Sequence, residues 1–117
     1  MTIHQINELL QGNQFDEALR ALDAALAIEP QNGYLWNRRG NVIQLLDRSD
    51  GPPLSEVERS HLKALEINAK DLDAIEELAH YYDIENKPDL AKKYAVEYLR
   101  IAQKACAAMS VIIKEEA

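Results

Sequence analysis

The 117-residue sequence has few of the residues that build disulfide-stabilised, turn-rich or disordered proteins. It contains one cysteine, four glycines and four prolines. Because Cys106 has no second cysteine with which to form an internal disulfide, nothing ties the fold to an oxidising compartment, and we expect a cytoplasmic protein. The scarcity of glycine and proline favours a helical chain over an all-β or a disordered one.

Positive charge is also scarce. Thirteen Lys and Arg face twenty Asp and Glu, so the formal net charge is -7 and the pI is about 4.9. This is the wrong sign for affinity based on phosphate contacts, which argues against nucleic acid as a partner. Residues 1–6 lack the basic and apolar segments of a secretory signal. The longest nearly apolar run, 105–113, spans about nine residues, whereas a membrane-spanning helix needs roughly 20. We therefore expect neither export nor membrane insertion.

Motifs for catalysis are missing as well. The glycines, at positions 12, 33, 40 and 51, form no phosphate-binding loop. One polar cluster has helical spacing: Asp73, Glu76, Glu77, His80 and Asp83. Glu77 and His80 have the spacing of helical metal ligands, but such sites take comparable ligands from other helices, and no second Glu-x-x-His is present. We therefore predict no enzyme, no cofactor and no metal, and the default interpretation of the cluster is a solvated charged face.

What the sequence does contain is an internal repeat. Similar short phrases occur at 25–28, 64–67 and 98–101, and the first interval between them is longer than the second. The other half of the repeat is marked by Leu9, Ile43 and Tyr82, and here the second interval is the longer one. The middle repeat therefore carries an insertion between Ile43 and Val57. The turn-prone stretch 47–53, with Asp50-Gly51 and two prolines, predicts an enlarged loop there.

Breaks between apolar segments predict six helices in three hairpins. Their expected ranges are about 2–11, 15–29, 33–47, 54–68, 71–84 and 88 onward to about 114. The pattern Ser55-x-x-Glu58 predicts a capping box that starts the fourth helix.

A helix-turn-helix repeat of about 34 residues resembles the tetratricopeptide repeat (TPR), whose pattern is Trp-x2-Leu-Gly-x2-Tyr, then Ala-x3-Phe, then Pro. The resemblance covers roughly residues 2–103. The matching residues are Leu9, Ala18, Leu22, Ala25 and Pro30 in the first repeat, Trp36, Gly40, Ile43 and Ala64 in the second, and Leu78, Ala79, Tyr82 and Ala91 in the third. Several positions depart from the pattern. Ile6 replaces a small residue, Arg39 a leucine and His61 an aromatic residue. In the third repeat, Ala95 and Tyr98 stand where a bulky and a small residue are expected, and Gln103 replaces the terminal proline.

The resemblance implies an all-α fold, an α-solenoid of three antiparallel helix hairpins in one domain over 1–117. Its repeats would span about 2–32, 33–70 with a loop insertion at 47–53, and 71–103, followed by a C-terminal helical extension over 104–117. The last part is either a long last helix or a capping helix.

In TPR proteins the first helix of each hairpin lines a concave groove that binds a peptide. By resemblance, the groove here would present Asn7, Gln11, Tyr34, Asn37, Arg38, Asn41, Gln44, Asp73, Glu77, His80 and Ile84. Some family members hold a partner's C-terminal carboxylate with Lys or Arg. Those places are taken here by Ile3, Asp73 and Glu77, and only Asn7 and Asn41 match, so the sequence predicts no such clamp.

The last helix has no internal stop signal. Its residues Ala91, Ala95, Tyr98, Ala102, Ala105, Met109 and Ile112 recur at spacings of 4 and 3, a heptad-like seam. Two interpretations follow. The segment past Gln103 folds as a cap over the exposed face of the last repeat, which we favour, or it projects and pairs with a second copy.

The predicted function is that of a non-catalytic interaction module whose groove binds a peptide or protein segment with a basic character. Residues 71–89 contain seven acids and one base, so most of the net charge lies on one helix and its flanks and would attract Lys or Arg. The alternatives are a dedicated small inhibitor, immunity-type or chaperone protein for one basic client, or a homodimerising adaptor joined through the C-terminal helix.

Overall fold

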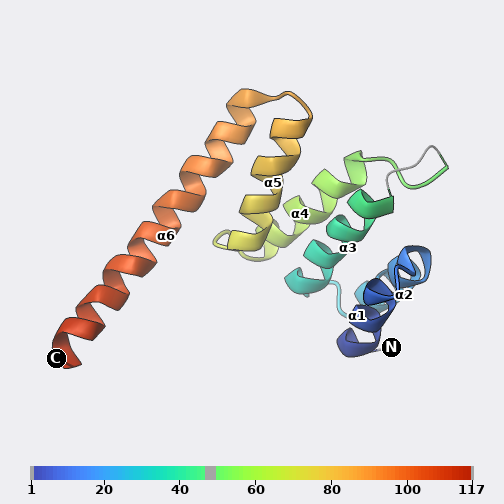
Figure 1. The fold of residues 1–117 in the computed structure, drawn as a ribbon, viewed down its shortest axis with the longest axis horizontal. Helices are drawn as coiled ribbons and strands as arrows, with labels where there is room; N and C mark the ends of the chain where they lie inside the picture. Colours follow the sequence, from blue (N-terminus) through green and yellow to red (C-terminus); the bar gives the residue numbers. More distant parts are fainter. Residues whose placement is uncertain (1, 47–49, 117) are drawn as a thin grey trace. The chain divides into compact units, whose positions relative to one another are not determined.

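The computed structural model describes residues 2–46 and 50–116, and all regular elements in these ranges are α-helices (Figure 1). In chain order they are α1 (Ile3–Gln11), α2 (Phe15–Ile28), α3 (Gly33–Leu46), α4 (Ser55–Ile67), α5 (Leu72–Ile84) and α6 (Pro88–Glu116). Each begins and ends close to its predicted bounds, which confirms the predicted fold class. Residues 47–49 of the predicted loop insertion lie outside the described residues. Among those described, no helix combines the length and apolar character needed to cross a membrane.

The chain divides into two compact units, Met1–Ala69 with α1 to α4 and Lys70–Ala117 with α5 and α6. The expected single domain over 1–117 therefore stays a prediction. In the first unit, consecutive helices pack on one another. One core cluster of this unit consists of Ile6, Leu22, Leu26, Leu35, Val42 and Leu46. Ile6, at a position that is usually small in the TPR pattern, is thus a core residue.

Two turns confirm the repeat register locally. Asn13, between α1 and α2, and Asn86, between α5 and α6, both adopt the left-handed conformation, with φ of 58° and 57°. In the first turn the Gln14 N–H donates to the Leu9 carbonyl (2.8 Å), and in the second the Lys87 N–H donates to the Tyr82 carbonyl (2.8 Å). Asparagine tolerates this conformation better than most residues, and the pattern closes the C-terminus of a helix. The same turn therefore joins the two helices of the first and third hairpins.

The start of α4 corrects one prediction. Ser55 is the first residue of the helix rather than its cap, and the cap position, Leu54, makes no side-chain hydrogen bond. The first turn is closed instead by backbone bonds from Glu56 N to Pro53 O (2.9 Å) and from Val57 N to Leu54 O (3.0 Å). The predicted capping box is therefore wrong, because the helix already begins at Ser55 and its first turn is closed by the backbone carbonyls of Pro53 and Leu54 rather than by a side chain at the cap position.

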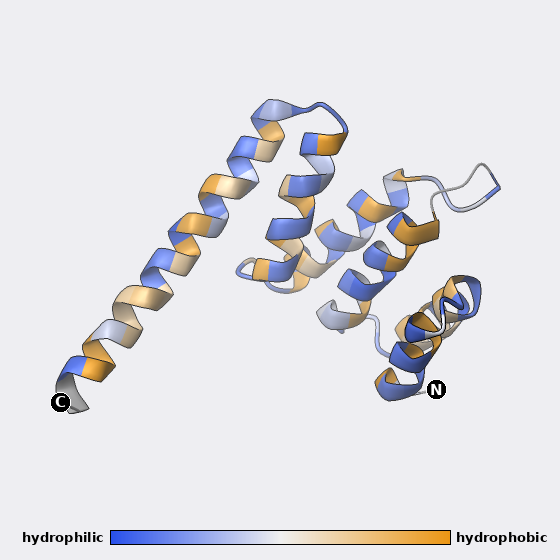
Figure 2. Ribbon diagram, in the orientation of Figure 1, coloured by the Kyte–Doolittle hydropathy of each residue, from blue (hydrophilic) through white to orange (hydrophobic). Residues whose placement is uncertain are grey.

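The second unit is a helix hairpin with arms of unequal length. The rings of Tyr82 in α5 and Tyr94 in α6 stack with centroids 5.7 Å apart. Helix α5 has 13 residues and α6 has 29, so α6 continues unbroken far past its partner (Figure 1), with apolar residues along its whole length (Figure 2). Residues 103–114 are all exposed. The favoured expectation of a cap is therefore wrong: no turn folds this segment back over the hairpin, and a long last helix is present instead.

Candidate functional site

Three of the predicted groove residues meet on the face shared by α1 and α3. The Arg38 guanidinium donates through Nη2 to Asn7 Oδ1, which links side chains of two different helices. The same guanidinium lies over the ring of Tyr34, 5.8 Å from its centroid, a geometry typical of a cation–π contact. Tyr34 remains 46% exposed. This face therefore offers a partner an aromatic ring held beside hydrogen-bonding groups.

The other predicted residues of the first unit differ in their accessibility. Gln11 is exposed, and Asn41 and Gln44 are half-buried. Asn37 is buried, and its Oδ1 lies 2.9 Å from Nδ1 of the buried His61 in α4. Side chains of neighbouring residues on a helix point about 100° apart, so the Asn37 side chain points in a different direction from that of Arg38 and lies in the α3–α4 contact. We therefore withdraw Asn37 from the groove and assign it to the core.

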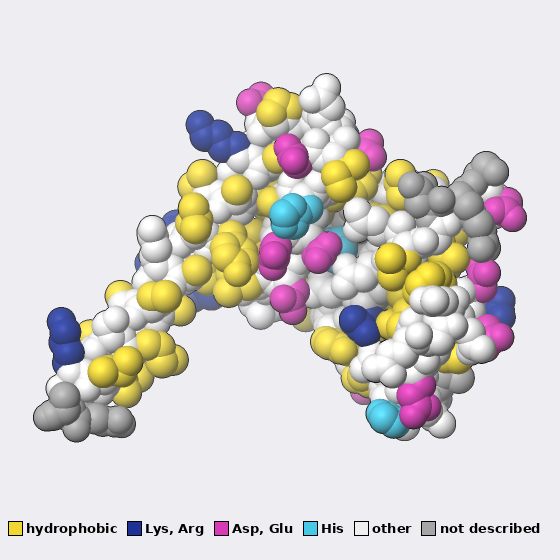
Figure 3. Space-filling view, in the orientation of Figure 1, with side chains coloured by type: hydrophobic (Ala, Val, Ile, Leu, Met, Phe, Trp, Pro, Cys, Tyr) yellow, Lys and Arg dark blue, Asp and Glu magenta, His cyan; other side chains and the backbone are white. Residues whose placement is uncertain are grey.

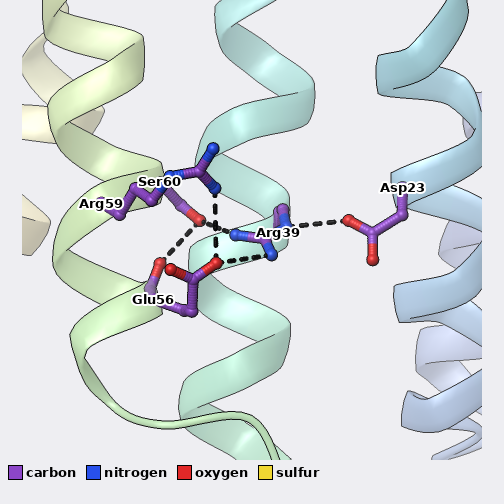
Figure 4. A network of polar contacts seen from close by, with 5 residues as sticks. All are labelled: Asp23, Arg39, Glu56, Arg59 and Ser60. Atoms are coloured by element: carbon purple, nitrogen blue, oxygen red, sulfur yellow. Dashed lines mark hydrogen bonds and ion pairs between the residues drawn. The ribbon is translucent and has the colours of Figure 1, made fainter.

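The polar cluster that the sequence did not reveal is centred on Arg39 (Figure 4). Its Nε donates to Asp23 Oδ1 (2.8 Å), its Nη1 to Ser60 Oγ (2.8 Å) and its Nη2 to Glu56 Oε1 (2.9 Å). Arg59 also donates to Glu56, at 3.3 Å. The Arg39 side chain is 13% exposed. One guanidinium thus ties α2, α3 and α4 together at a position where the repeat pattern has a leucine.

Electrostatics support a structural role for this cluster. Burial of the Arg39 guanidinium lowers its pKa, but the hydrogen bonds and charges of Asp23 and Glu56 raise it by more, so the pKa lies above its ordinary value. A partly buried charge with this many charge-assisted bonds is held in place. The sequence signal for this cluster was an arginine at a position where the repeat pattern has leucine, because a cation in a core position requires acids nearby. The sequence did not show which acids these are, since that depends on how the helices pack.

In the second unit, α5 carries the predicted acidic cluster on an accessible face. Asp73, Glu76, His80 and Asp83 are exposed, and Glu77 is half-buried. Figure 3 shows acidic side chains gathered around a histidine over this helix. His80 Nε2 lies 3.9 Å from Glu76 Oε1, at the limit of an ion pair.

The half-buried Glu77 is the electrostatic centre of this face. Burial raises the pKa of its carboxyl, the negative charges of Glu76 and Asp73 raise it further, and His80 partly opposes them. A cation brought to this face would relieve this repulsion. The remaining predicted residue on α5, Ile84, is 69% exposed and adds an apolar contact at the end of the helix.

The side chains that the structure describes suggest no metal centre, since none of their His, Cys, Asp and Glu residues come together in a group of three or more suited to a metal ion. What α5 offers is a row of carboxylates on one helix, which suits binding a cationic side chain.

Comparison with known proteins identifies the fold. No protein-family model matches the sequence, and no curated protein matches it either. Among solved structures, the chain is similar to the second TPR of Spaghetti (RPAP3) bound to the HSP90 peptide SRMEEVD, with a TM-score of 0.73 and 14% sequence identity. The alignment covers 84% of this chain and 86% of that one. The fold is therefore a TPR-like helical repeat, as the repeat pattern predicted.

Proposed function

We propose that this protein is a non-catalytic interaction module that binds a basic peptide or protein segment through the acidic face of α5. The observation that carries the proposal is the cluster of Asp73, Glu76, Glu77 and Asp83 on an accessible face of a hairpin's first helix. The polar face of α1 and α3, with Asn7, Gln11, Tyr34, Arg38, Asn41 and Gln44, is proposed as a second contact surface. We place the protein in the cytoplasm, because its single cysteine needs no oxidising compartment.

The ligand of the similar structure supports the choice of a basic partner by contrast. The peptide SRMEEVD contains two glutamates and ends in an aspartate. The positions at which family members carry basic clamp residues hold Ile3, Asp73 and Glu77 in this chain. Two carboxylates about 4 Å from a third would each repel it by about 1 kcal/mol in water and by more near a protein surface. The same two carboxylates would attract lysine or arginine.

A charge-reversal experiment tests this proposal. The probe is a fluorescent extended peptide with three lysines, and its counterpart with three glutamates is the negative control. Exposed ion pairs contribute about 0.2–1 kcal/mol each, so reversing two acids in Asp73→Lys with Glu77→Lys should weaken binding of the lysine peptide by roughly tenfold. Fluorescence anisotropy at two salt concentrations should also show a flatter salt dependence in the variant.

The matched control is Glu17→Lys with Glu58→Lys, which makes the same change in net charge on α2 and α4. It should leave binding nearly unchanged, because the effect depends on local charge rather than on the total. Equal loss in both double variants, or tighter binding of the glutamate peptide, would refute a specific role for α5.

A pulldown from the source cell with the same two double variants identifies the partner. Several basic partners lost together in Asp73→Lys with Glu77→Lys would support a general module. A single dominant basic client, bound one to one, would instead support a dedicated inhibitor, immunity-type protein or chaperone. Unchanged recovery of all partners would overturn both.

We also propose, independently, that the chain pairs with a second copy through α6. Residues 103–114 are exposed and include Met109, Val111, Ile112 and Ile113, each with roughly half or more of its surface accessible. Contiguous apolar surface of this kind marks an interaction site. Sedimentation equilibrium should give a dimer for the full chain and a monomer for a chain that ends at Gln103. Equal masses for the two would overturn the pairing.

A further inference from the structure

The face of α6 that packs on α5 continues past the end of that contact. Within the hairpin it consists of Ala91, Tyr94, Tyr98 and Ile101, which are half-buried. Beside this face, the seam of Ala91, Ala95, Tyr98 and Ala102 runs along the groove side of the helix and continues as Ala105, Met109 and Ile112, which are exposed. Helix α5 therefore lies beside only the first half of this seam, and the other half is open to a second helix.

A groove of matching character lies beside the covered half. It is lined by Glu76, Ala79 and His80 of α5 and by Ala95, Tyr98 and Leu99 of α6, and a neighbouring hollow extends it along Asp83 and Ala91. Small residues on both helices allow close approach of a third helix. In a helical repeat protein, the next hairpin would cover such a face.

We infer that this groove receives the exposed half of α6 from a second copy, antiparallel to the first copy's α6, around a two-fold axis near Ala102. This inference specifies the geometry of the pairing proposed above and rests on it. Because the groove is lined by Glu76, His80 and Asp83, the second copy and a basic peptide bound over these residues would exclude each other. In an antiparallel pair of helices, the sequence positions of two facing residues add up to a nearly constant value. With the axis near Ala102, the facing layers are Ala91 with Ile112, Ala95 with Met109, Tyr98 with Ala105, and Ala102 with Ala102.

The sizes of the facing residues support this register. Each layer away from the axis places a large side chain against an alanine, and the alternation lets the two helices interdigitate without voids or clashes. The half of the seam beside α5 has two alanines and Tyr98, and the projecting half has Ala105, Met109 and Ile112. A self-complementary surface of this kind forms a closed two-fold dimer.

The charged residues of the projecting segment lie away from the seam. Between residues 103 and 114, the only charged side chains are Lys104 and Lys114. Lys114 is one heptad from Ala107 and Lys104 is three residues from it, so both lysines lie on the face opposite the seam, where they stay in water when the seam is covered.

The overlap between the two helices is long. Layers from Ala91 to Ile112 span about 32 Å at about 1.5 Å per residue, and each copy contributes α5 as well as α6 to the groove.

Charge substitutions in one facing layer test the register in the full-length protein. By sedimentation equilibrium, the wild type should have twice the 13.2 kDa mass of one chain. Ala95→Glu and Met109→Lys should each weaken dimerisation at least tenfold, and together they should largely restore it, because the two new charges face each other twice in the dimer. Ala107→Lys, on the opposite face of the helix, is the control and should dimerise like the wild type.

Disulfide trapping separates antiparallel from parallel pairing. In the inferred register, the two copies of Cys106 are displaced by about 13 Å along the axis, beyond the reach of a disulfide, so mild oxidation should leave the wild type unlinked. Ala102→Cys in a Cys106→Ser background should cross-link across the axis. A monomeric wild type would overturn both the pairing and this geometry. A dimer that cross-links through Cys106, or that the combined substitution fails to restore, would overturn this geometry alone.

Discussion

Gly40 lies where α3 passes closest to α4, and its replacement by alanine tests that packing directly. A Cβ added at Gly40 would lie 2.6 Å from Nε2, 2.9 Å from Cε1 and 3.0 Å from Cδ2 of His61. Ordinary contacts need about 3.5 Å or more, so the imidazole would have to withdraw by roughly 1 Å. His61 has no exposed surface, and its Nδ1 lies 2.9 Å from Asn37 Oδ1. The ring therefore cannot move without losing that bond or displacing its neighbours.

The expected magnitude follows from three contributions. Overpacking a buried contact costs about 1–3 kcal/mol, and weakening the buried hydrogen bond costs about 0.5–1.5 kcal/mol. Replacing a helical glycine by alanine returns about 1 kcal/mol through helix propensity. Gly40→Ala should therefore lower the free energy of unfolding by about 1–3 kcal/mol, measured by urea denaturation followed by circular dichroism.

Gly12→Ala is the matched control, because the added Cβ meets its neighbours at 3.6 Å or more, which is ordinary contact. Its stability should equal or slightly exceed that of the wild type. A second arm combines Gly40→Ala with His61→Ala, which should cost less than the sum of the two single changes, because the new methyl group fills part of the vacated space. If Gly40→Ala is as stable as Gly12→Ala, the close approach of α3 to α4 is refuted.

Three further predictions concern other charged residues. Arg39→Met should lower stability by about 2–3 kcal/mol by leaving Glu56 incompletely paired, whereas Asp23→Asn, at a 53% exposed side chain, should cost less than about 1 kcal/mol; equal losses in denaturation experiments would contradict the assigned roles. Asp71, whose Oδ1 accepts from Ala74 N at 3.1 Å, caps α5, so Asp71→Ala should lower the melting temperature through a loss of about 1 kcal/mol, and no change would argue against the cap. Because the pKa of Glu77 is raised in the folded state, ionised Glu77 lowers stability above that pKa, and the penalty disappears as the pH falls through it. Glu77→Gln should therefore be more stable than the wild type at pH 7, with the difference shrinking in the acidic range just above the ordinary carboxyl pKa; a constant difference across pH would contradict this.

Local signals in the sequence were sufficient for the helices and their order. Asn13 and Asn86 end their helices in the same left-handed turn because each can adopt positive φ within a short polar break. The cap of α4 was misjudged for the opposite reason. Ser55 has the right residue type, but the path of the chain through Pro53 and Leu54 decided which backbone groups needed a partner.

The candidate sites also differ in whether the sequence alone could predict them. The acidic face of α5 could be predicted because its residues lie on one helix, so helical spacing alone brings them together. Asn37 could not be separated from Arg38 by sequence, since only the packing of α4 shows that its side chain meets His61. The Arg39 cluster depended on Asp23 and Glu56, which lie on two other helices. The binding role of these surfaces stays a prediction.

The sequence by itself determined the class of fold, the boundaries of the six helices and the concentration of negative charge on α5, because periodicity, helix-breaking residues and charge act over a few neighbouring residues. Only the tertiary structure decided what the departures from the repeat pattern do and where α6 goes. A cation at a leucine position is stabilised by residues distant in the chain. Whether the apolar face of α6 is covered likewise depends on which other elements reach it, and residues 103–114 are left exposed.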